Sequence, residues 1–321
     1  AQGGLALEDC TFIGNYRGMT ISGTCAKRAN RISGCTFYAN YNHNGRDGGA
    51  FQASATTTIT NCLFKRNYSG ALNSAGAIDS HGQTIYVYDC DFIENKSSGD
   101  GRSAVAWVGY GRAVRCRFVD NRVSLSDSTK NGRMFDGGVH SGGLVHGTAF
   151  SSSATFFTSA TVLSSMTVAG NGAGGKLSDG TLTAWNSILV GAGGTACAME
   201  GAGNMVWNFA AGLSGTGYVV ADPRLADPPS GDLRPLCDSD ALTSGEVPTP
   251  SNYASDRRFW FYLAGDPSTK ATAAFGVSGA WQTGFPAYYS ISDERGLLEV
   301  TGGSGKNGLV EPGETVSLTI R

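Results

Sequence analysis

The sequence has few charged residues and no long apolar run. Only 16% of its 321 residues are Asp, Glu, Lys or Arg, and the formal net charge is −2. A balance this close to neutral gives no electrostatic footprint for nucleic acid. No apolar stretch approaches the roughly 18 residues that a membrane-spanning helix requires. The sequence therefore predicts neither a nucleic-acid partner nor a membrane span.

Amphipathic helices of useful length are also missing from the pattern. Glycine supplies 47 residues, and turn-forming residues interrupt the chain throughout. Ser, Thr, Gly and Asn provide the polar surface in place of charge, which favours a secreted, extracellular β protein. The chain begins at Ala1 without an initiator methionine, so we expect a mature product or the ordered part of a longer one.

One six-residue signature, Cys-x-Phe-x-x-Asn, is present five times. Its copies begin at positions 10, 35, 62, 90 and 116, at intervals of 25, 27, 28 and 26 residues. A fixed period in this range indicates a solenoid, in which each unit buries its apolar face against its neighbours. The predicted structural ladder comprises Cys10, Phe12, Asn15, Cys35, Phe37, Asn40, Cys62, Phe64, Asn67, Cys90, Phe92, Asn95, Cys116, Phe118 and Asn121.

Each repeat predicts one coil of a right-handed parallel β-helix. Runs rich in β-branched and aromatic residues at 57–60 and 84–88 are typical of strands. Two small residues followed by an apolar one, at 48–51, 75–78 and 137–139, open a further strand, and 103–105 is a looser copy. Coils stack about 4.8 Å apart, so we expect the Phe residues in a buried spine and the Asn residues in a ladder at a turn.

The repeat weakens after residue 121, and we expect about eight coils that end near residue 192. The predicted domains are a β-helix at 1–192, a closing segment at 193–250 and a small β-sandwich-like domain at 251–321. An unpaired strand edge is costly, so the last strand either closes its own sheet or pairs with another molecule as a donor strand. This assembly strand consists of Thr315, Val316, Ser317, Leu318, Thr319 and Ile320.

Seven of the eight cysteines fall into two groups, and Cys25 is expected at the strand-opening alanine position of the first coil. Five belong to the ladder, where parallel side-chain directions fit the torsion of a disulfide poorly. We expect them to be small buried residues selected for their volume. Cys197 and Cys237 lie off the ladder in loop-rich sequence. We expect a disulfide between these two, which would require an oxidising compartment.

Three motifs resemble known families. The pairing of Gly-Gly-Ala-apolar with Phe-x-x-Asn resembles the polymorphic outer-membrane protein repeat of bacterial autotransporter passengers. Asp-Pro-Arg-Leu-Ala-Asp at 222–227, followed by Gly-Asp-Leu-Arg-Pro-Leu at 231–236, is similar to the closing segment of secreted β-helix proteins with choice-of-anchor C-termini. Residues 305–320 resemble the first strand of bacterial surface Ig-like domains. These resemblances imply a secreted or cell-surface structural protein or adhesin, and no catalytic residue set.

The enzymatic alternative is a polysaccharide lyase or glycoside hydrolase, since parallel β-helices also host these activities. Glycoside hydrolysis needs two carboxylates on one face, and the sequence has no Asp-Asp pair and no Arg-x-Lys motif. Asp79, two residues before His81, is the remaining catalytic candidate. A polar turn is the favoured interpretation of this pair.

Metal sites have little sequence support. Asp89, Asp91 and Glu94 cluster in one coil and Asp120 follows one coil later, so these are the candidate ligands for Ca²⁺. Such clusters are more often solvated faces. We also considered an approach of Asp91 and Arg115 across coils. The four histidines lack metal-ligand spacing, and we predict no metal and no cofactor.

The function that the sequence favours is structural rather than enzymatic. The end coils of a solenoid expose strand edges and an apolar bore, and solenoids need caps to remain soluble. We therefore expect a secreted structural or adhesive surface protein that self-associates into a filament or layer. A carbohydrate-active enzyme or a carbohydrate-binding module, with a polysaccharide or cell-surface partner, stays open as the alternative.

Overall fold

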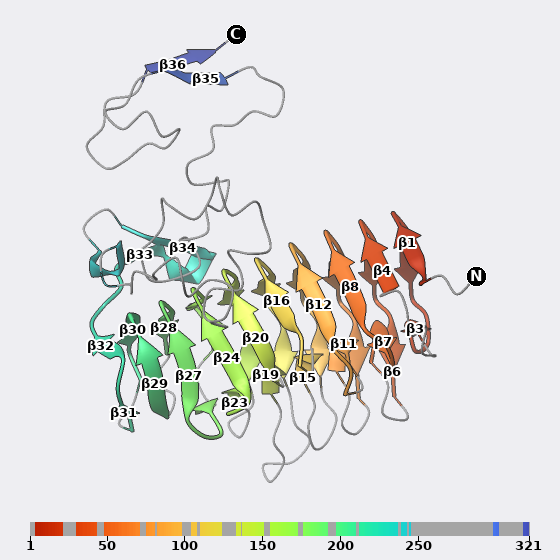
Figure 1. Ribbon diagram of the computed structural model, residues 1–321, viewed down its shortest axis with the longest axis horizontal. Coiled ribbons are helices and arrows are strands. Elements are labelled where there is room, and N and C mark those ends of the chain that lie inside the picture. The colour runs from red at the N-terminus through yellow and green to blue at the C-terminus, as the bar shows by residue number, and fades with distance from the viewer. Residues whose placement is uncertain are drawn as a thin grey trace.

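The computed structural model shows a solenoid whose strands stand side by side along the long axis of the molecule (Figure 1). Described residues are 4–21, 30–43, 48–70, 75–80, 82–97, 104–107, 110–123, 133–135, 137–150, 155–172, 176–191, 197–209, 212–236, 239–242, 244, 298–301 and 317–320. The predicted parallel β-helix is confirmed, because every strand pairing described between its coils is parallel, with a shift in register between β11 and β15.

Two ten-stranded sheets run the length of the solenoid. Sheet A contains β1 (Ala6–Glu8), β4 (Asn30–Ser33), β8 (Thr57–Thr60), β12 (Ile85–Tyr88), β16 (Arg112–Val114), β20 (Gly138–Ser141), β24 (Thr161–Ser164), β27 (Leu182–Trp185), β29 (Ala198–Ala202) and β31 (Ser214–Gly215). Sheet B contains β2 (Thr11–Ile13), β5 (Thr36–Tyr38), β9 (Leu63–Lys65), β13 (Asp91–Ile93), β17 (Arg117–Val119), β21 (Leu144–His146), β25 (Thr167–Val168), β28 (Ile188–Val190), β30 (Asn204–Trp207) and β32 (Tyr218–Val220).

Two shorter sheets complete the coils. Sheet C contains β6 (Tyr41–Asn42), β10 (Tyr68–Ser69), β14 (Lys96–Ser97), β18 (Arg122–Val123) and β22 (Ala149–Phe150). Sheet D contains β3 (Met19–Ile21), β7 (Phe51–Ala53), β11 (Ala75–Asp79), β15 (Ala104–Trp107), β19 (Arg133–Phe135), β23 (Thr155–Phe157) and β26 (Lys176–Ser178). A full coil visits the sheets in the order A, B, C and D.

Left-handed residues turn the chain at two corners of each coil. The A–B corner uses the residue before the ladder cysteine, and the B–C corner uses the residue before the ladder asparagine. All have φ between 52° and 65°, a region that is costly for residues other than glycine. At the first five A–B corners they are Asp9, Gly34, Asn61, Asp89 and Arg115, and at the first five B–C corners they are Gly14, Ala39, Arg66, Glu94 and Asp120.

The predicted phenylalanine spine is present in the core. Rings of successive coils lie 4.9, 4.8, 4.9 and 4.5 Å apart between centroids, from Phe12 to Phe118, with interplanar angles of 8° or less. Phe37, Phe64 and Phe92 are completely buried. Each ring therefore covers the next, and the spine gains dispersion energy and apolar burial in every coil.

The solenoid extends beyond the boundary predicted near residue 192. Strand register continues the spine through Val145, Val168, Leu189, Val206 and Val220. Aliphatic side chains replace the rings at these positions, and the coils become shorter. The apolar inward position survives while the Cys-x-Phe-x-x-Asn signature disappears, which is why the repeat pattern ended too early.

One of the predicted strand openings belongs to a different sheet. The copies at 48–51 and 75–78 lead into sheet D, through β7 and β11. The copy at 137–139 instead enters β20 of sheet A, where Val139 aligns with Arg112 of the preceding coil. The sheet D strand of that preceding coil is β19, which ends shortly before this copy begins.

The closing segment packs on the outer face of sheet B. It contains β33 (Leu225–Asp227), the 3₁₀ turn η1 (Pro228–Ser230), β34 (Asp232–Pro235) and η2 (Asp240–Leu242), and β33 pairs antiparallel with β34. A second apolar cluster joins it to the solenoid. Its buried members are Leu144, Ala169, Ile188, Met205, Leu225, Leu233 and Ala241.

The predicted C-terminal domain is described only in part. β35 (Leu298–Thr301) pairs antiparallel with β36 (Ser317–Ile320), so most of the assembly strand pairs within its own chain. Thr315 and Val316, and the other strands predicted for 251–297, lie outside the described residues. Among the described residues, no helix is long and apolar enough to cross a membrane.

The spine predicts a large effect from a single truncation. Phe64→Ala removes a ring that is stacked on both sides, and it should lower the free energy of unfolding by about 4 kcal/mol. Ile13→Ala is the control, because that side chain is 62% exposed, and it should change stability by less than about 0.5 kcal/mol. Urea unfolding followed by circular dichroism measures both. Equal losses in the two variants would contradict the role of the spine.

Candidate functional site

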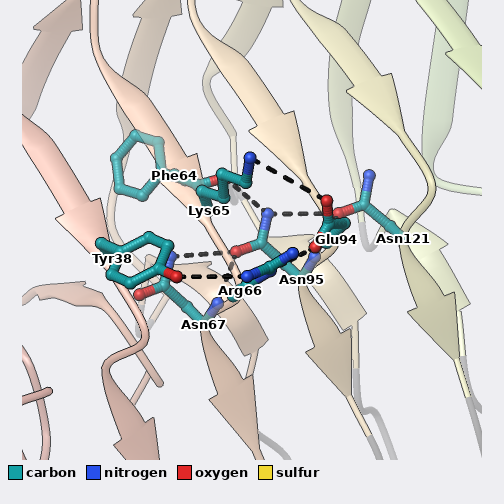
Figure 2. A network of polar contacts seen from close by, with 8 residues as sticks. All are labelled: Tyr38, Phe64, Lys65, Arg66, Asn67, Glu94, Asn95 and Asn121. Carbon is teal, nitrogen blue, oxygen red and sulfur yellow. Dashed lines mark hydrogen bonds and ion pairs between the residues drawn. The ribbon is translucent and has the colours of Figure 1, made fainter.

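The corner between sheets B and C contains a row of asparagine side chains. Asn67 Nδ2 donates to Asn95 Oδ1 at 2.9 Å and to the Phe37 carbonyl at 2.9 Å. Its Oδ1 accepts from the Asn40 backbone N–H and from Asn40 Nδ2, both at 3.0 Å. Figure 2 shows this row running from Asn67 through Asn95 to Asn121. The amides satisfy one another, so the row holds coils in register and offers no catalytic group.

The row is interrupted at one coil. Thr148 occupies the ladder position after Asn121, and its hydroxyl oxygen is buried without a hydrogen-bond partner. Its backbone N–H donates to Asn171 Oδ1 at 2.9 Å, and Asn171 Nδ2 donates to the Val145 carbonyl at 3.2 Å. The pattern therefore resumes one coil later, and Thr148 is a defect between Asn121 and Asn171.

Thr148→Asn should repair this defect. The new amide would accept from Asn121 and donate to the Phe118 carbonyl, as its counterparts do. We expect a gain of about 1 kcal/mol in the free energy of unfolding. Thr148→Ala is the control and should be close to neutral, because the lost hydroxyl has no partner. The midpoints of urea unfolding measure the stability of both variants. A Thr148→Asn protein that is less stable than the unmodified chain, beside an unchanged Thr148→Ala control, would refute this account.

The ladder cysteines have a second role besides filling space. Cys35, Cys62 and Cys90 accept the backbone N–H of the ladder cysteine one coil earlier, at Sγ distances of 3.4, 3.4 and 3.3 Å. Met166 Sδ and Ser187 Oγ accept in the same way in later coils, each at 3.2 Å. All five ladder thiols are free. Burial raises the pKa of Cys90 well above its ordinary value, so this thiol stays protonated.

Three of the four proposed calcium ligands, Asp89, Asp91 and Glu94, are paired with cations from neighbouring coils. Arg115 binds Asp89 through two hydrogen bonds, of 2.6 and 2.7 Å. The approach that we considered between Asp91 and Arg115 is therefore wrong, because Asp91 faces Arg117 instead, at 3.7 Å. In-register stacking places these residues directly above one another. Within the described residues, no three His, Cys, Asp or Glu side chains converge on a metal.

Glu94 is the centre of a small network on the surface (Figure 2). It forms ion pairs with Arg66 and, at 3.9 Å, with Lys65, and Arg66 also donates to the Tyr38 hydroxyl at 3.2 Å. The Arg66 guanidinium lowers the pKa of the Glu94 carboxyl. These side chains are exposed, so the network contributes little to stability, and it leaves Glu94 with no surplus charge for a metal ion.

The catalytic candidates are not brought together. Asp79 is the last residue of β11, is completely buried and aligns with Gln52 and Trp107 in the neighbouring coils. His81 lies outside the described residues. A carboxylate with no exposed surface cannot receive a polysaccharide without rearrangement. The described geometry around Asp79 thus offers no access for a substrate.

The predicted disulfide between Cys197 and Cys237 is not formed. Cys197 is a free thiol, and Cys237 lies outside the described residues. Cys197 belongs to the main apolar core, and burial raises its pKa to about 11. The loop-rich sequence around it suggested a disulfide outside the repeat, but the solenoid continues through this region, and the side chain packs in the interior.

Two histidines were not recognised as structural residues from the sequence. His140 is fully buried in the bore, with Nε2 3.2 Å from the Gly137 carbonyl and its ring 4.0 Å from that of Phe135. His146 faces the other way, and its Nε2 lies 2.9 Å from the Pro228 carbonyl of the closing segment. The strand register could have revealed His140, since it aligns with the inward Ala113 and Leu163.

His140 predicts a loss of stability in acid. Burial lowers its pKa to about 4 from 6.5, so between these values the unfolded chain binds a proton that the folded chain excludes. The stabilisation that comes from keeping His140 neutral is fully present above pH 6.5, and it decreases as the pH falls towards 4. Between pH 7.5 and pH 4.5, the free energy of unfolding of His140→Leu should fall by roughly 2–3 kcal/mol less than that of the unmodified protein.

Urea unfolding at the two pH values measures this difference. His43→Leu is the control, because His43 is exposed, and it should retain the full acid sensitivity. Carboxylates also respond to acid, but they contribute equally to all three proteins. If the stability of His140→Leu depends on pH in the same way as that of the unmodified chain, the buried imidazole is not the cause of the acid sensitivity.

Comparisons with protein-family models, curated proteins and solved structures find no match to this chain. The stacked parallel sheets establish the β-helix independently of any relative. The likeness to polymorphic outer-membrane protein repeats, and that of residues 222–236 to a choice-of-anchor segment, stay predictions based on short motifs.

Proposed function

We propose that this protein is a structural or adhesive surface protein whose solenoids join end to end into a filament or layer. The observation that supports this is the state of the two solenoid ends. Sheet A runs from β1 to β31 and sheet B from β2 to β32, and within the described residues these four strands are paired on one side only. An open strand edge is a template for another chain.

The first coil has the groups that a preceding coil would bind. In the interior, the N–H after each ladder cysteine donates to the carbonyl of the previous ladder cysteine, as Thr36 does to Cys10 at 2.8 Å. The corresponding group of the first coil is the N–H of Thr11. Asn15 donates to Asn40, so its own Oδ1 occupies the acceptor position of the row. An incoming coil would find the same pattern as every interior coil.

The apolar surfaces at the two ends complement each other. The spine begins at Phe12, which is partly buried, and ends at Val220, which is 61% exposed. Stacking the last coil of one copy on the first coil of the next would continue the spine from Val220 to Phe12. Such a contact joins two different surfaces, so it repeats without closing and generates a linear assembly.

A secreted or cell-surface location and a non-enzymatic role belong to the same proposal. The low charge content and the resemblance of the repeat support the location. The burial of Asp79 and the pairing of the surface acids with arginines support the role. The alternative of a polysaccharide lyase or hydrolase has no observation in its favour among the described residues.

Blocking either end should stop assembly. Thr11→Pro removes the N–H that points towards a preceding coil, and Val220→Lys places a charge where the spine would continue. Each variant alone should remain monomeric, since a solenoid edge without its donor or its apolar surface cannot propagate. A mixture of the two should form dimers and stop there, because each partner keeps one working end. Sedimentation velocity and negative-stain microscopy measure the result.

Two control variants distinguish end-to-end stacking of solenoids from other modes of assembly. Tyr110→Lys changes a side chain that is 82% exposed and should leave filaments intact. Removal of residues 315–321 should also leave them intact, whereas donor-strand assembly would be abolished. Isolated monomers of the unmodified protein at every concentration and salt would refute self-assembly.

A further inference from the structure

Sheet C carries a row of aromatic and basic side chains on its outer face. In β10 and β14 the second residue is fully buried and the first is partly exposed. Strand register aligns these first residues in successive coils, and Tyr16 extends the row through its bridge to Tyr41. We name this row the sheet C stripe, and its members are Tyr16, Tyr41, Tyr68, Lys96 and Arg122.

The stripe is continuous. Tyr16 and Tyr41 are 47% and 39% exposed, and Arg122 is exposed as well. The exposed His43 lies between two of the tyrosines. The contacts along the row are Arg17 Cζ to the Tyr16 ring (5.6 Å), Tyr16 to Tyr41 (5.6 Å), Tyr41 to His43 (5.6 Å), His43 to Tyr68 (5.1 Å) and Lys96 Nζ to the Tyr68 ring (5.3 Å).

The charge of the stripe has one sign. Lys96 and Arg122 are its charged members, and no acid occupies an outward position in the described strands of sheet C. The nearest acids precede these strands at the corner. Glu94 is paired with two cations, and the Asp120 carboxylate lies over Gly147 of the next coil. The stripe therefore presents uncompensated positive charge beside aromatic rings.

The fold itself does not require these side chains. The inward half of sheet C is closed by the buried Asn42, Ser69 and Ser97, and the asparagine row already holds this corner in register. Aromatic rings combine apolar surface with a polar hydroxyl, and a flanking ammonium or guanidinium binds carboxylate or sulfate oxygens. Together they match a polymer whose units have an apolar ring face and a negative group.

We propose that the sheet C stripe binds an extended acidic polysaccharide that lies along the solenoid axis. Sugar rings would lie on the tyrosines of the first coils, and Lys96 and Arg122 would bind carboxylates further along. Successive rungs are about 4.8 Å apart, so one extended chain would meet a new side chain at every coil. The stripe lies on the side of the solenoid, so its ligand is independent of end-to-end assembly.

The ring geometry favours a polysaccharide over a single-stranded nucleic acid. Protein surfaces that bind single strands stack successive bases on aromatic faces. Successive rings along the row, with His43 between Tyr41 and Tyr68, are tilted by 62°, 56° and 61°, so neighbouring rings do not form parallel platforms. Tilted rings still offer apolar contact to the C–H groups of a sugar.

Binding of a fluorescently labelled oligogalacturonide, measured by anisotropy with the full chain, tests the proposal. The unmodified protein should bind this probe and not a neutral dextran oligomer of equal length. Tyr41→Ala and Lys96→Ala should each weaken binding roughly fivefold, and Tyr41→Phe should retain it. Affinity should fall as salt rises, less steeply in Lys96→Ala.

Tyr86→Ala is the matched control. Tyr86 lies on the outer face of sheet A with Arg112 Cζ 5.2 Å from its ring, so it repeats the same pairing outside the stripe, and binding should be unchanged. Thermal melting verifies that each variant is folded. Failure to bind the oligogalacturonide, equal losses in Tyr86→Ala, or tighter binding of oligothymidylate would each overturn the proposal. The Thr11→Pro protein should bind normally, which separates this result from that of assembly.

Discussion

Every coil of this protein must present to its neighbour the same groups that it receives from the other side. The asparagine row is the strongest expression of this constraint, because each buried amide both donates to and accepts from the adjacent coils. Stacked rings and in-register strands obey the same rule with apolar contact and backbone hydrogen bonds. A coil is therefore most stable between two others. The rule is broken at Thr148 and, within the described residues, at β1, β2, β31 and β32, which pair on one side only.

At many corners of the coils, residues other than glycine adopt an unfavourable left-handed backbone conformation, which allows successive coils to stack in register. Residues such as Arg66 and Arg115 adopt a backbone conformation that suits glycine, and their side chains then point outward. Stacking places an acid next to a base at some of these corners, as in the pair of Arg115 with Asp89. Surface ion pairs of this kind add little energy, but they neutralise acids that would otherwise resemble a metal site.

The sequence predicted the fold where side-chain identity carries the signal. Cys-x-Phe-x-x-Asn marks a sulfur acceptor, a ring and an amide ladder, and only a few residue types can fill each position. It failed where a position requires only an apolar group, so the coils that contain Val206 and Val220 were not predicted. The disulfide predicted for Cys197 was wrong, and the buried position of His140 was not predicted, for the same reason. Inward or outward orientation depends on register, which a weak repeat does not reveal.

The direction of the amide row has an electrical consequence for the whole rod. Asn15, Asn40, Asn67 and Asn95 each donate from Nδ2 to the Oδ1 of the next asparagine, so the side-chain carbonyl dipoles of this row add along the axis with their negative end at the first coil. Two rods that met with like ends would bring negative poles face to face. Opposite ends attract, so two copies that meet end to end would favour the same orientation along the solenoid axis.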